Sequence, residues 1–153
     1  MSQETVLIVE DDDETRTLLR DVVQARAGYR VLLATDGQTG LESALVEHPD
    51  VILLDLMLPR LSGLDLLEYL HRQGSQIPAI VLTAYCSEQD ILKAFRLGAK
   101  DFLQKPVVVK EVWNAIERAL AEERLRRERE NLTRALAQAN QRLQQQVQNW
   151  ATL

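Results

Sequence analysis

Residues 51–59, V-I-L-L-D-L-M-L-P, decide the fold because they place one carboxylate, Asp55, at the end of an otherwise apolar run. Four consecutive aliphatic residues are typical of a strand buried on both faces, as in the middle of a parallel sheet. Burying an unpaired carboxylate is costly, so we expect Asp55 just past the strand's end, where water, a metal or a reactant can reach it. In open parallel sheets, ligands bind at that rim.

Around this run, short apolar stretches alternate with amphipathic ones, which is the pattern of βα units in an α/β protein with a parallel sheet. Helix ends are predicted at glycines such as Gly28, Gly74 and Gly98. The pattern predicts a (βα)5 domain with right-handed crossovers. Strands are predicted at residues 6–9, 30–33, 51–54, 79–82 and 101–103, and helices at 13–26, 40–47, 63–72, 88–97 and from 109 onward.

The last predicted helix differs from the others because no Gly or Pro follows Pro106 to end it. Apolar residues recur every seven positions, which indicates the d and a positions of a coiled coil, although Glu122, Arg129 and Gln146 interrupt the seam. We predict a parallel two-stranded coiled coil and hence a homodimer, the alternative being a solvated single helix that frays. The seam residues are Leu125, Leu132, Leu136, Ala139, Leu143 and Trp150.

The predicted organisation is therefore one domain at residues 1–121 and a helical coiled-coil linker at 122–153. The linker is expected to lead to a downstream domain outside this sequence. It resembles the helices that precede GAF, PAS, kinase or cyclase modules in multidomain regulators.

Composition excludes several classes of protein. Among the 153 residues no apolar run approaches the roughly 18 residues of a membrane span, and M-S-Q-E-T is too short and acidic for a secretory signal. A lone Cys86 excludes an internal disulfide and fits a reducing compartment, so we expect a cytoplasmic protein without membrane contact. Acidic residues outnumber basic ones before Pro106, and glutamates interleave with the arginines at 124–129, which argues against nucleic acid binding by this segment.

Four of the five predicted strands end in a residue capable of chemistry. These residues are Glu10 and Asp11, Asp55, Thr83, and Lys105 with Pro106. Three converging carboxylates would repel one another, and Mg²⁺ resolves this because it accepts oxygen ligands and often serves with a phosphate. One ammonium and one hydroxyl nearby suit phosphoryl transfer, with Asp55 as a nucleophile that becomes an aspartyl phosphate.

Other acids near the first strand have a structural explanation. Asp12, Asp13 and Glu14 are expected to cap the first helix and to complement its dipole.

Taken together, the motifs resemble the receiver domain of bacterial two-component response regulators, over about residues 5–121. The resemblance implies a flavodoxin-like fold with strand order 2-1-3-4-5, which places Glu10, Asp11 and Asp55 together. It also implies a sensor histidine kinase or phosphotransfer protein as the partner that supplies the phosphoryl group. The motifs are V-L-I-V-E-D-D at 6–12, L-L-D-L-M-L-P-x-x-x-G at 53–63, V-L-T-A at 81–84 and G-A-x-D-F-L-x-K-P at 98–106.

The resemblance also implies a role for each site residue. Asp55 corresponds to the phosphoacceptor. It also corresponds to part of the Mg²⁺ site, together with Asp11, Glu10 through water and the Met57 carbonyl. Lys105, before a cis proline bond, would contact the phosphoryl group. Thr83 and Phe102 would be the switch pair that alters the surface of the fourth helix, fifth strand and fifth helix. Phe102 departs from the tyrosine of many relatives.

A haloacid dehalogenase-type Mg²⁺-dependent phosphatase is the alternative, because residues 11–15 satisfy its D-x-D-x-T motif with Asp11 as nucleophile. That mechanism needs further acids after the lysine, yet no Asp follows Asp101. It also leaves Asp55 without a role.

Overall fold

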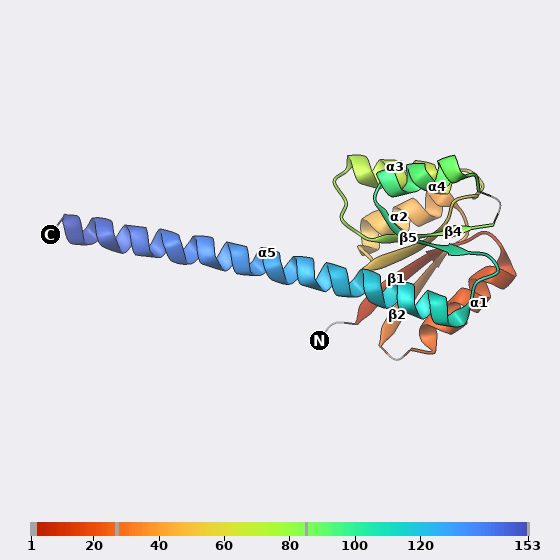
Figure 1. Cartoon of the computed structure of the whole chain (residues 1–153), viewed down its shortest axis with the longest axis horizontal. Coiled ribbons are helices and arrows are strands. Elements are labelled where there is room, and N and C mark those ends of the chain that lie inside the picture. The colour runs from red at the N-terminus through yellow and green to blue at the C-terminus, as the bar shows by residue number, and fades with distance from the viewer. Residues whose placement is uncertain (1–2, 27, 85, 153) are drawn as a thin grey trace. The chain divides into compact units, whose positions relative to one another are not determined.

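The computed structural model describes residues 3–26, 28–84 and 86–152, in which five parallel strands alternate with five helices (Figure 1). The strand order β2-β1-β3-β4-β5 confirms the predicted flavodoxin-like α/β fold. The elements are β1 Glu4–Val9, α1 Asp13–Gln24, β2 Tyr29–Ala34, α2 Gly37–Glu47, β3 Val51–Asp55, α3 Gly63–Arg72, β4 Ala79–Thr83, α4 Glu88–Arg96, β5 Ala99–Gln104 and α5 Val109–Ala151.

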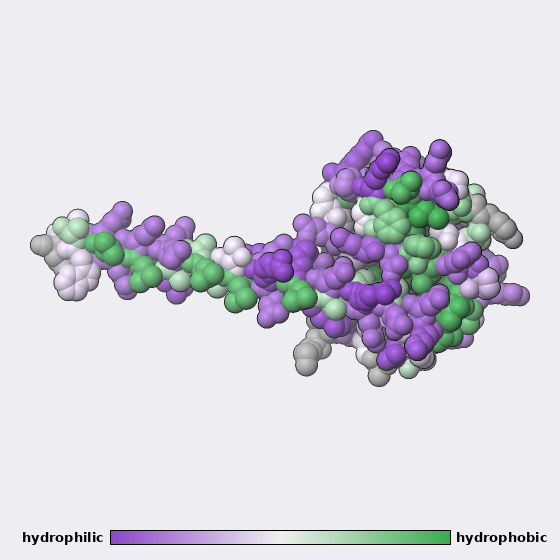
Figure 2. All heavy atoms as spheres, in the orientation of Figure 1, coloured by the Kyte–Doolittle hydropathy of each residue, from purple (hydrophilic) through white to green (hydrophobic). Residues whose placement is uncertain are grey.

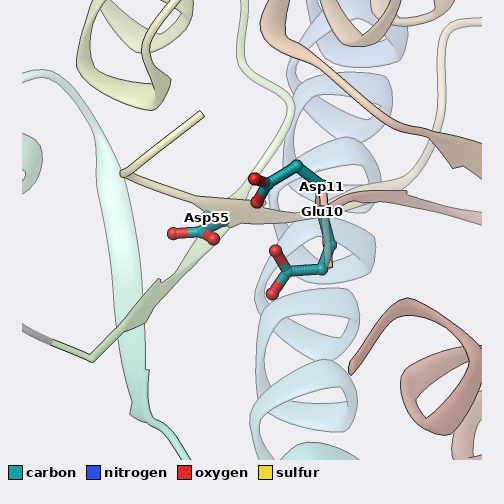
Figure 3. A group of neighbouring side chains, drawn as sticks. All are labelled: Glu10, Asp11 and Asp55. Carbon is teal, nitrogen blue, oxygen red and sulfur yellow. The ribbon is translucent and has the colours of Figure 1, made fainter. Parts of the chain in front are cut away.

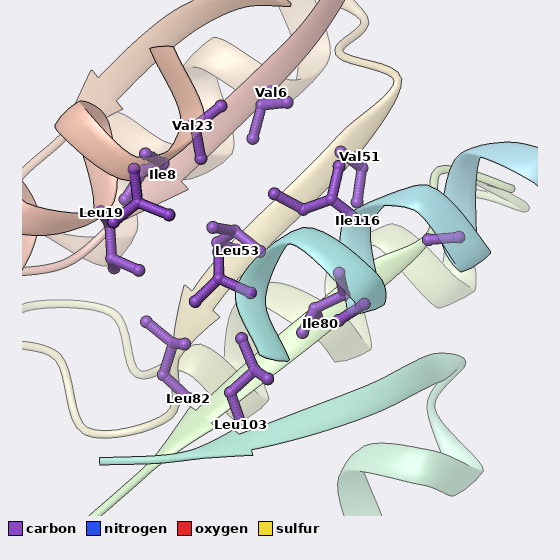
Figure 4. Packing of buried hydrophobic residues seen from close by; sticks show 14 of the residues in the cluster. Val6, Ile8, Leu19, Val23, Val51, Leu53, Ile80, Leu82, Leu103 and Ile116 are labelled. Carbon is purple, nitrogen blue, oxygen red and sulfur yellow. The ribbon is translucent and has the colours of Figure 1, made fainter. Parts of the chain in front are cut away.

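Two hydrophobic clusters cover the two faces of the sheet. Successive strand side chains point to opposite faces, so β1, β3 and β4 contribute to both clusters and are buried along almost their whole length. The cluster in Figure 4 joins the sheet to α1 and α5 through residues such as Ile8, Leu19, Leu53, Ile80 and Ile116. The second cluster joins it to α2, α3 and α4 through residues such as Leu7, Ala44, Leu54, Leu66 and Ala94.

Helix α2 begins at Gly37, three residues before the predicted start at Gly40. Asp36 caps it, because its carboxylate accepts a hydrogen bond from the Thr39 backbone N–H at 2.8 Å. Gly37 is required here for space: a Cβ at this position would lie 1.7 Å from the Leu61 carbonyl oxygen. The poor helix propensity of glycine concealed this start in the sequence.

Contacts divide the chain into two compact units, residues 1–120 and 121–153. The second unit is helical, and its seam leucines are exposed, from 59% for Leu125 to 67% for Leu136. Figure 2 shows hydrophobic side chains following one another along this helix. None of the helices in the described part of the chain combines the length and apolar character that a membrane span needs.

Replacing Gly37 by alanine tests the packing of α2 against the loop before α3. The Gly37→Ala variant should lose roughly 1–3 kcal/mol of unfolding free energy, because the new methyl group meets backbone that cannot move aside. Urea denaturation measures this, with the exposed Gln38→Ala in the same helix as control. Equal stability of Gly37→Ala and the native chain would contradict the packing described here.

Candidate functional site

Three acidic side chains meet at the carboxyl ends of β1 and β3. Glu10 follows β1, Asp55 ends β3, and the strands pair in parallel with Val9 opposite Leu54. One carboxylate oxygen from each of Glu10, Asp11 and Asp55 lies within 4.8 Å of the others. In Figure 3 the three carboxylates point toward one another. The sequence therefore predicted correctly that these acids converge.

Lys105 brings a positive charge into this acidic cluster. Its Nζ donates a hydrogen bond to Asp55 Oδ2 at 2.8 Å and also forms an ion pair with Glu10. The residue follows β5, where its backbone N–H donates to the Thr83 carbonyl at 2.7 Å and its peptide bond to Pro106 is cis, as predicted. Two strands away from Asp55 in the sheet, β5 thus supplies the counterion of the acidic cluster.

The predicted exposure of Asp55 was wrong. Asp55 is the last residue of β3 rather than the first beyond it, and it is only 4% exposed, while Glu10 is fully buried. The expectation assumed an unpaired carboxylate, whereas Asp55 is paired with Lys105 and its Oδ1 accepts the Met57 backbone N–H at 2.9 Å. Asp11, the exposed member of the acidic cluster, faces solvent instead.

The electrostatics of the acidic cluster follow from this burial. Desolvation raises the pKa of Glu10 to about 7; hydrogen bonding to Asp55 acts in the same direction, and Lys105 opposes it. Burial alone would lower the pKa of the Lys105 ammonium. Its hydrogen bonds to Asp55 and Glu10 outweigh burial, so the pKa is raised and the side chain stays charged.

The two residues predicted as a switch pair lie on neighbouring strands. Thr83 ends β4 and is buried, whereas Phe102 on β5 is 46% exposed and packs edge-to-face on Phe95 of α4, with ring centroids 6.2 Å apart. Phe102 lies opposite Val81 in the β4–β5 register, while Thr83 lies opposite Gln104. Phe102 is therefore two residues away along β5 from Gln104, the residue that pairs with Thr83.

The acids after Asp11 have the capping role that the sequence predicted. Asp12 caps α1, its Oδ2 accepting the Thr15 backbone N–H at 3.0 Å, and hydrogen bonds from Thr15 lower the pKa of Asp12. Asp13 is exposed and paired with Arg16, outside the acidic cluster. Because the phosphatase alternative needs the second acid of D-x-D-x-T at the site, this placement does not favour it.

Two supporting residues of the site escaped the sequence reasoning. Arg16 donates to the Glu10 carbonyl at 3.0 Å and so holds the chain where it leaves β1. Gly63 lies so close to β3 that a Cβ would be 2.3 Å from the Asp55 carbonyl oxygen. Gly63 is the last residue of the motif at 53–63, but the motif does not predict that this glycine packs against the backbone of Asp55.

Comparison with known proteins agrees with this geometry. The family model described as the response regulator receiver domain matches residues 6–117. The chain belongs to the receiver domain family of response regulators.

Among curated relatives, the alkaline phosphatase synthesis transcriptional regulatory protein PhoP of Bacillus subtilis is 39% identical over 107 residues, covering 70% of this chain and 44% of PhoP. The transcriptional activator protein PfeR of Pseudomonas aeruginosa is 44% identical over 107 residues, covering 70% of this chain and 34% of PfeR. The chain thus spans less than half the length of these two relatives.

Solved structures share the fold. A CheY-like response regulator receiver domain protein from Methanospirillum hungatei superposes with a TM-score of 0.77 at 27% identity, over 82% of this chain and 99% of that one. NtrX from Brucella abortus gives a TM-score of 0.77 at 28% identity, over 86% of this chain and 30% of NtrX.

The raised pKa of Glu10 predicts a pH dependence of stability. From the ordinary value of 4.5 up to about 7, folded Glu10 keeps its proton while the unfolded chain has lost it, so its contribution to the unfolding free energy falls as pH rises. Denaturation at a series of pH values without divalent metal should show this fall, and Glu10→Gln should reduce it. The exposed Glu42→Gln is the control. The same pH slope for Glu10→Gln and the native chain would contradict the prediction.

Proposed function

We propose that this receiver domain accepts a phosphoryl group on Asp55 from the phosphohistidine of a sensor histidine kinase or phosphotransfer protein, in a Mg²⁺-dependent reaction. The observation that carries the proposal is the position of Asp55, which lies 2.8 Å from the ammonium of Lys105 and next to the carboxylates of Glu10 and Asp11. The chain acts as a phosphoacceptor with self-phosphorylation and self-dephosphorylation as its only enzymatic activities. A cytoplasmic location follows from such a donor.

In the transfer, an oxygen of Asp55 attacks the phosphorus and forms an O–P bond. The N–P bond of the donor breaks, and its ring nitrogen keeps the electron pair. The Lys105 ammonium lies beside Asp55 Oδ2. Its positive charge can therefore stabilise the negative charge that develops on the phosphoryl oxygens during the transfer. The Met57 N–H holds Oδ1 and so fixes the orientation of the carboxylate. The chain thus presents a positioned nucleophile with its counterion in place.

The donor set fits Mg²⁺. Three carboxylates with an oxygen each within 4.8 Å of the others outnumber the single ammonium of Lys105, and hard divalent cations prefer such oxygen ligands. Asp11 and Asp55, the Met57 carbonyl and, through water, Glu10 would hold the ion. Mg²⁺ would supply charge that neutralises the phosphoryl oxygens.

The signal would leave the site through Thr83 and Phe102. The Thr83 hydroxyl would turn toward the phosphoryl group and the Phe102 ring inward, changing the surface of α4, β5 and α5. Phe102 is 46% exposed and contacts Phe95 edge-to-face. This supports the proposal, because the ring is partly in solvent and an inward turn would bury it.

The long helix completes the proposal. Residues 1–121 form the receiver and 122–153 a coiled-coil linker that joins two copies in parallel, leading to a downstream output domain. The exposed seam leucines support this, because most of the stability of a helix in a protein comes from packing an apolar face against a partner. The segment itself would not bind nucleic acid, given its interleaved charges.

Mass spectrometry tests the acceptor directly. After incubation with acetyl phosphate and Mg²⁺, the native chain should gain the mass of one phosphoryl group, and Asp55→Asn should gain none. Asp65→Asn, an exposed acid in the first turn of α3, is the matched control and should be phosphorylated normally. Uptake by Asp55→Asn equal to that of the native chain would refute the assignment.

Association of the chain should respond to the state of Asp55. Sedimentation at micromolar concentration should show a dimer whose sedimentation coefficient changes when beryllofluoride and Mg²⁺ are added, because α5 leads from the switch surface into the linker and the way the two copies associate should change. A monomer in both states would defeat the proposed homodimer.

A further inference from the structure

The linker consists of two chemically different segments. Residues 122–130, the proximal segment, contain four glutamates and four arginines, whereas residues 131–153, the distal segment, contain two arginines and no acidic residue. At the a positions of the seam the proximal segment has Glu122 and Arg129. The distal segment has apolar residues at all of its seam positions except Gln146.

In the proximal segment four of the charged side chains, Glu123, Arg126, Arg127 and Glu130, are paired within one helix. Arg126 donates from Nε to Glu123 at 3.0 Å and from its terminal nitrogen to Glu130 at 2.6 Å. Arg127 pairs with the same Glu123 at 3.3 Å. Such pairs stabilise a helix without any partner, so this segment does not need a second copy to remain helical.

The distal segment has no comparable support. Without an acidic side chain it cannot form ion pairs of this kind within itself, and Leu132, Leu143 and Trp150 are 60%, 59% and 78% exposed. Burying them between two helices stabilises the helix and removes the exposed apolar stripe of Figure 2. The seven-residue spacing matches the same stripe on a second copy of this chain, which we take as the occupant.

Charge at the proximal a positions acts against the same pairing. In a parallel dimer Glu122 faces Glu122 of the second copy and Arg129 faces Arg129, so like charges oppose closure. Closure also brings one favourable contact. In a parallel dimer an a residue packs beside the partner's preceding g residue, so Arg129 would lie close to Glu128 of the second copy and the two opposite charges would attract. Closure of the proximal segment is therefore opposed by the a positions and favoured by the contact of Arg129 with Glu128.

We propose that the distal segment holds two copies together permanently, while the proximal segment opens and closes with the phosphorylation state of Asp55 and is closed in the phosphorylated state. This deepens the proposed function and rests on it. The distal pairing keeps the proximal helices at high effective concentration, so a modest change at the receivers suffices to close them.

Cysteine cross-linking in the full-length chain tests both segments. In a Cys86→Ser background, Leu125→Cys and Ala139→Cys place a thiol at a proximal and a distal d position. Under mild oxidation Ala139→Cys should cross-link equally with and without acetyl phosphate and Mg²⁺, and Leu125→Cys should cross-link several-fold more with them. No cross-link at Ala139→Cys, or equal cross-linking of Leu125→Cys in both conditions, overturns the proposal.

A second variant tests the proximal segment without phosphorylation. Adding Arg129→Leu should raise resting cross-linking of Leu125→Cys several-fold, while Arg134→Leu, outside the seam, should leave it unchanged. No rise with Arg129→Leu overturns the proposal whatever Asp55 does. The intact mass of the same samples separates the two hypotheses: phosphate uptake without a change at Leu125→Cys defeats the linker device alone, whereas no uptake defeats the proposed function.

Discussion

The ion pairs of Lys105 with Asp55 and Glu10 are the constraint on which the site depends. Each buried carboxylate costs free energy in a low-dielectric environment, and two of them side by side also repel. The Lys105 ammonium, which follows β5, offsets part of both costs. The acidic cluster still has more negative charges than positive ones. This excess explains why the site suits a divalent cation. Burial, more than the neighbouring charge of Asp55, raises the pKa of Glu10 to about 7.

Parallel strands explain how residues 10, 55 and 105 come together although they are far apart in sequence. All five carboxyl ends lie along one rim, and the order β2-β1-β3-β4-β5 puts the two acid-bearing strands next to each other. The cores on both faces bury these strands and hold them in place, so the rim is a stable platform for the site. The close approach of Gly63 to the Asp55 backbone and the hold of Arg16 on the Glu10 carbonyl add to this rigidity.

The sequence predicted the parts of this arrangement that depend on periodicity. Apolar runs located the strands, and the residue after each run located the acidic cluster and Lys105. Burial of Asp55 was not foreseen, because it depends on which carboxylate the Lys105 side chain reaches, and spacing does not contain that information. The start of α2 was missed for a related reason, since the glycine at position 37 is required by the backbone of Leu61, a neighbour distant in sequence.

The most direct test of this account is a crystal structure of the chain grown with Mg²⁺ and beryllofluoride. The account predicts beryllium bonded to a carboxylate oxygen of Asp55, the Lys105 ammonium in contact with a fluoride, and the metal ion between Asp11 and Asp55. Beryllofluoride on any other carboxylate, or a metal ion held away from these acids, would contradict it.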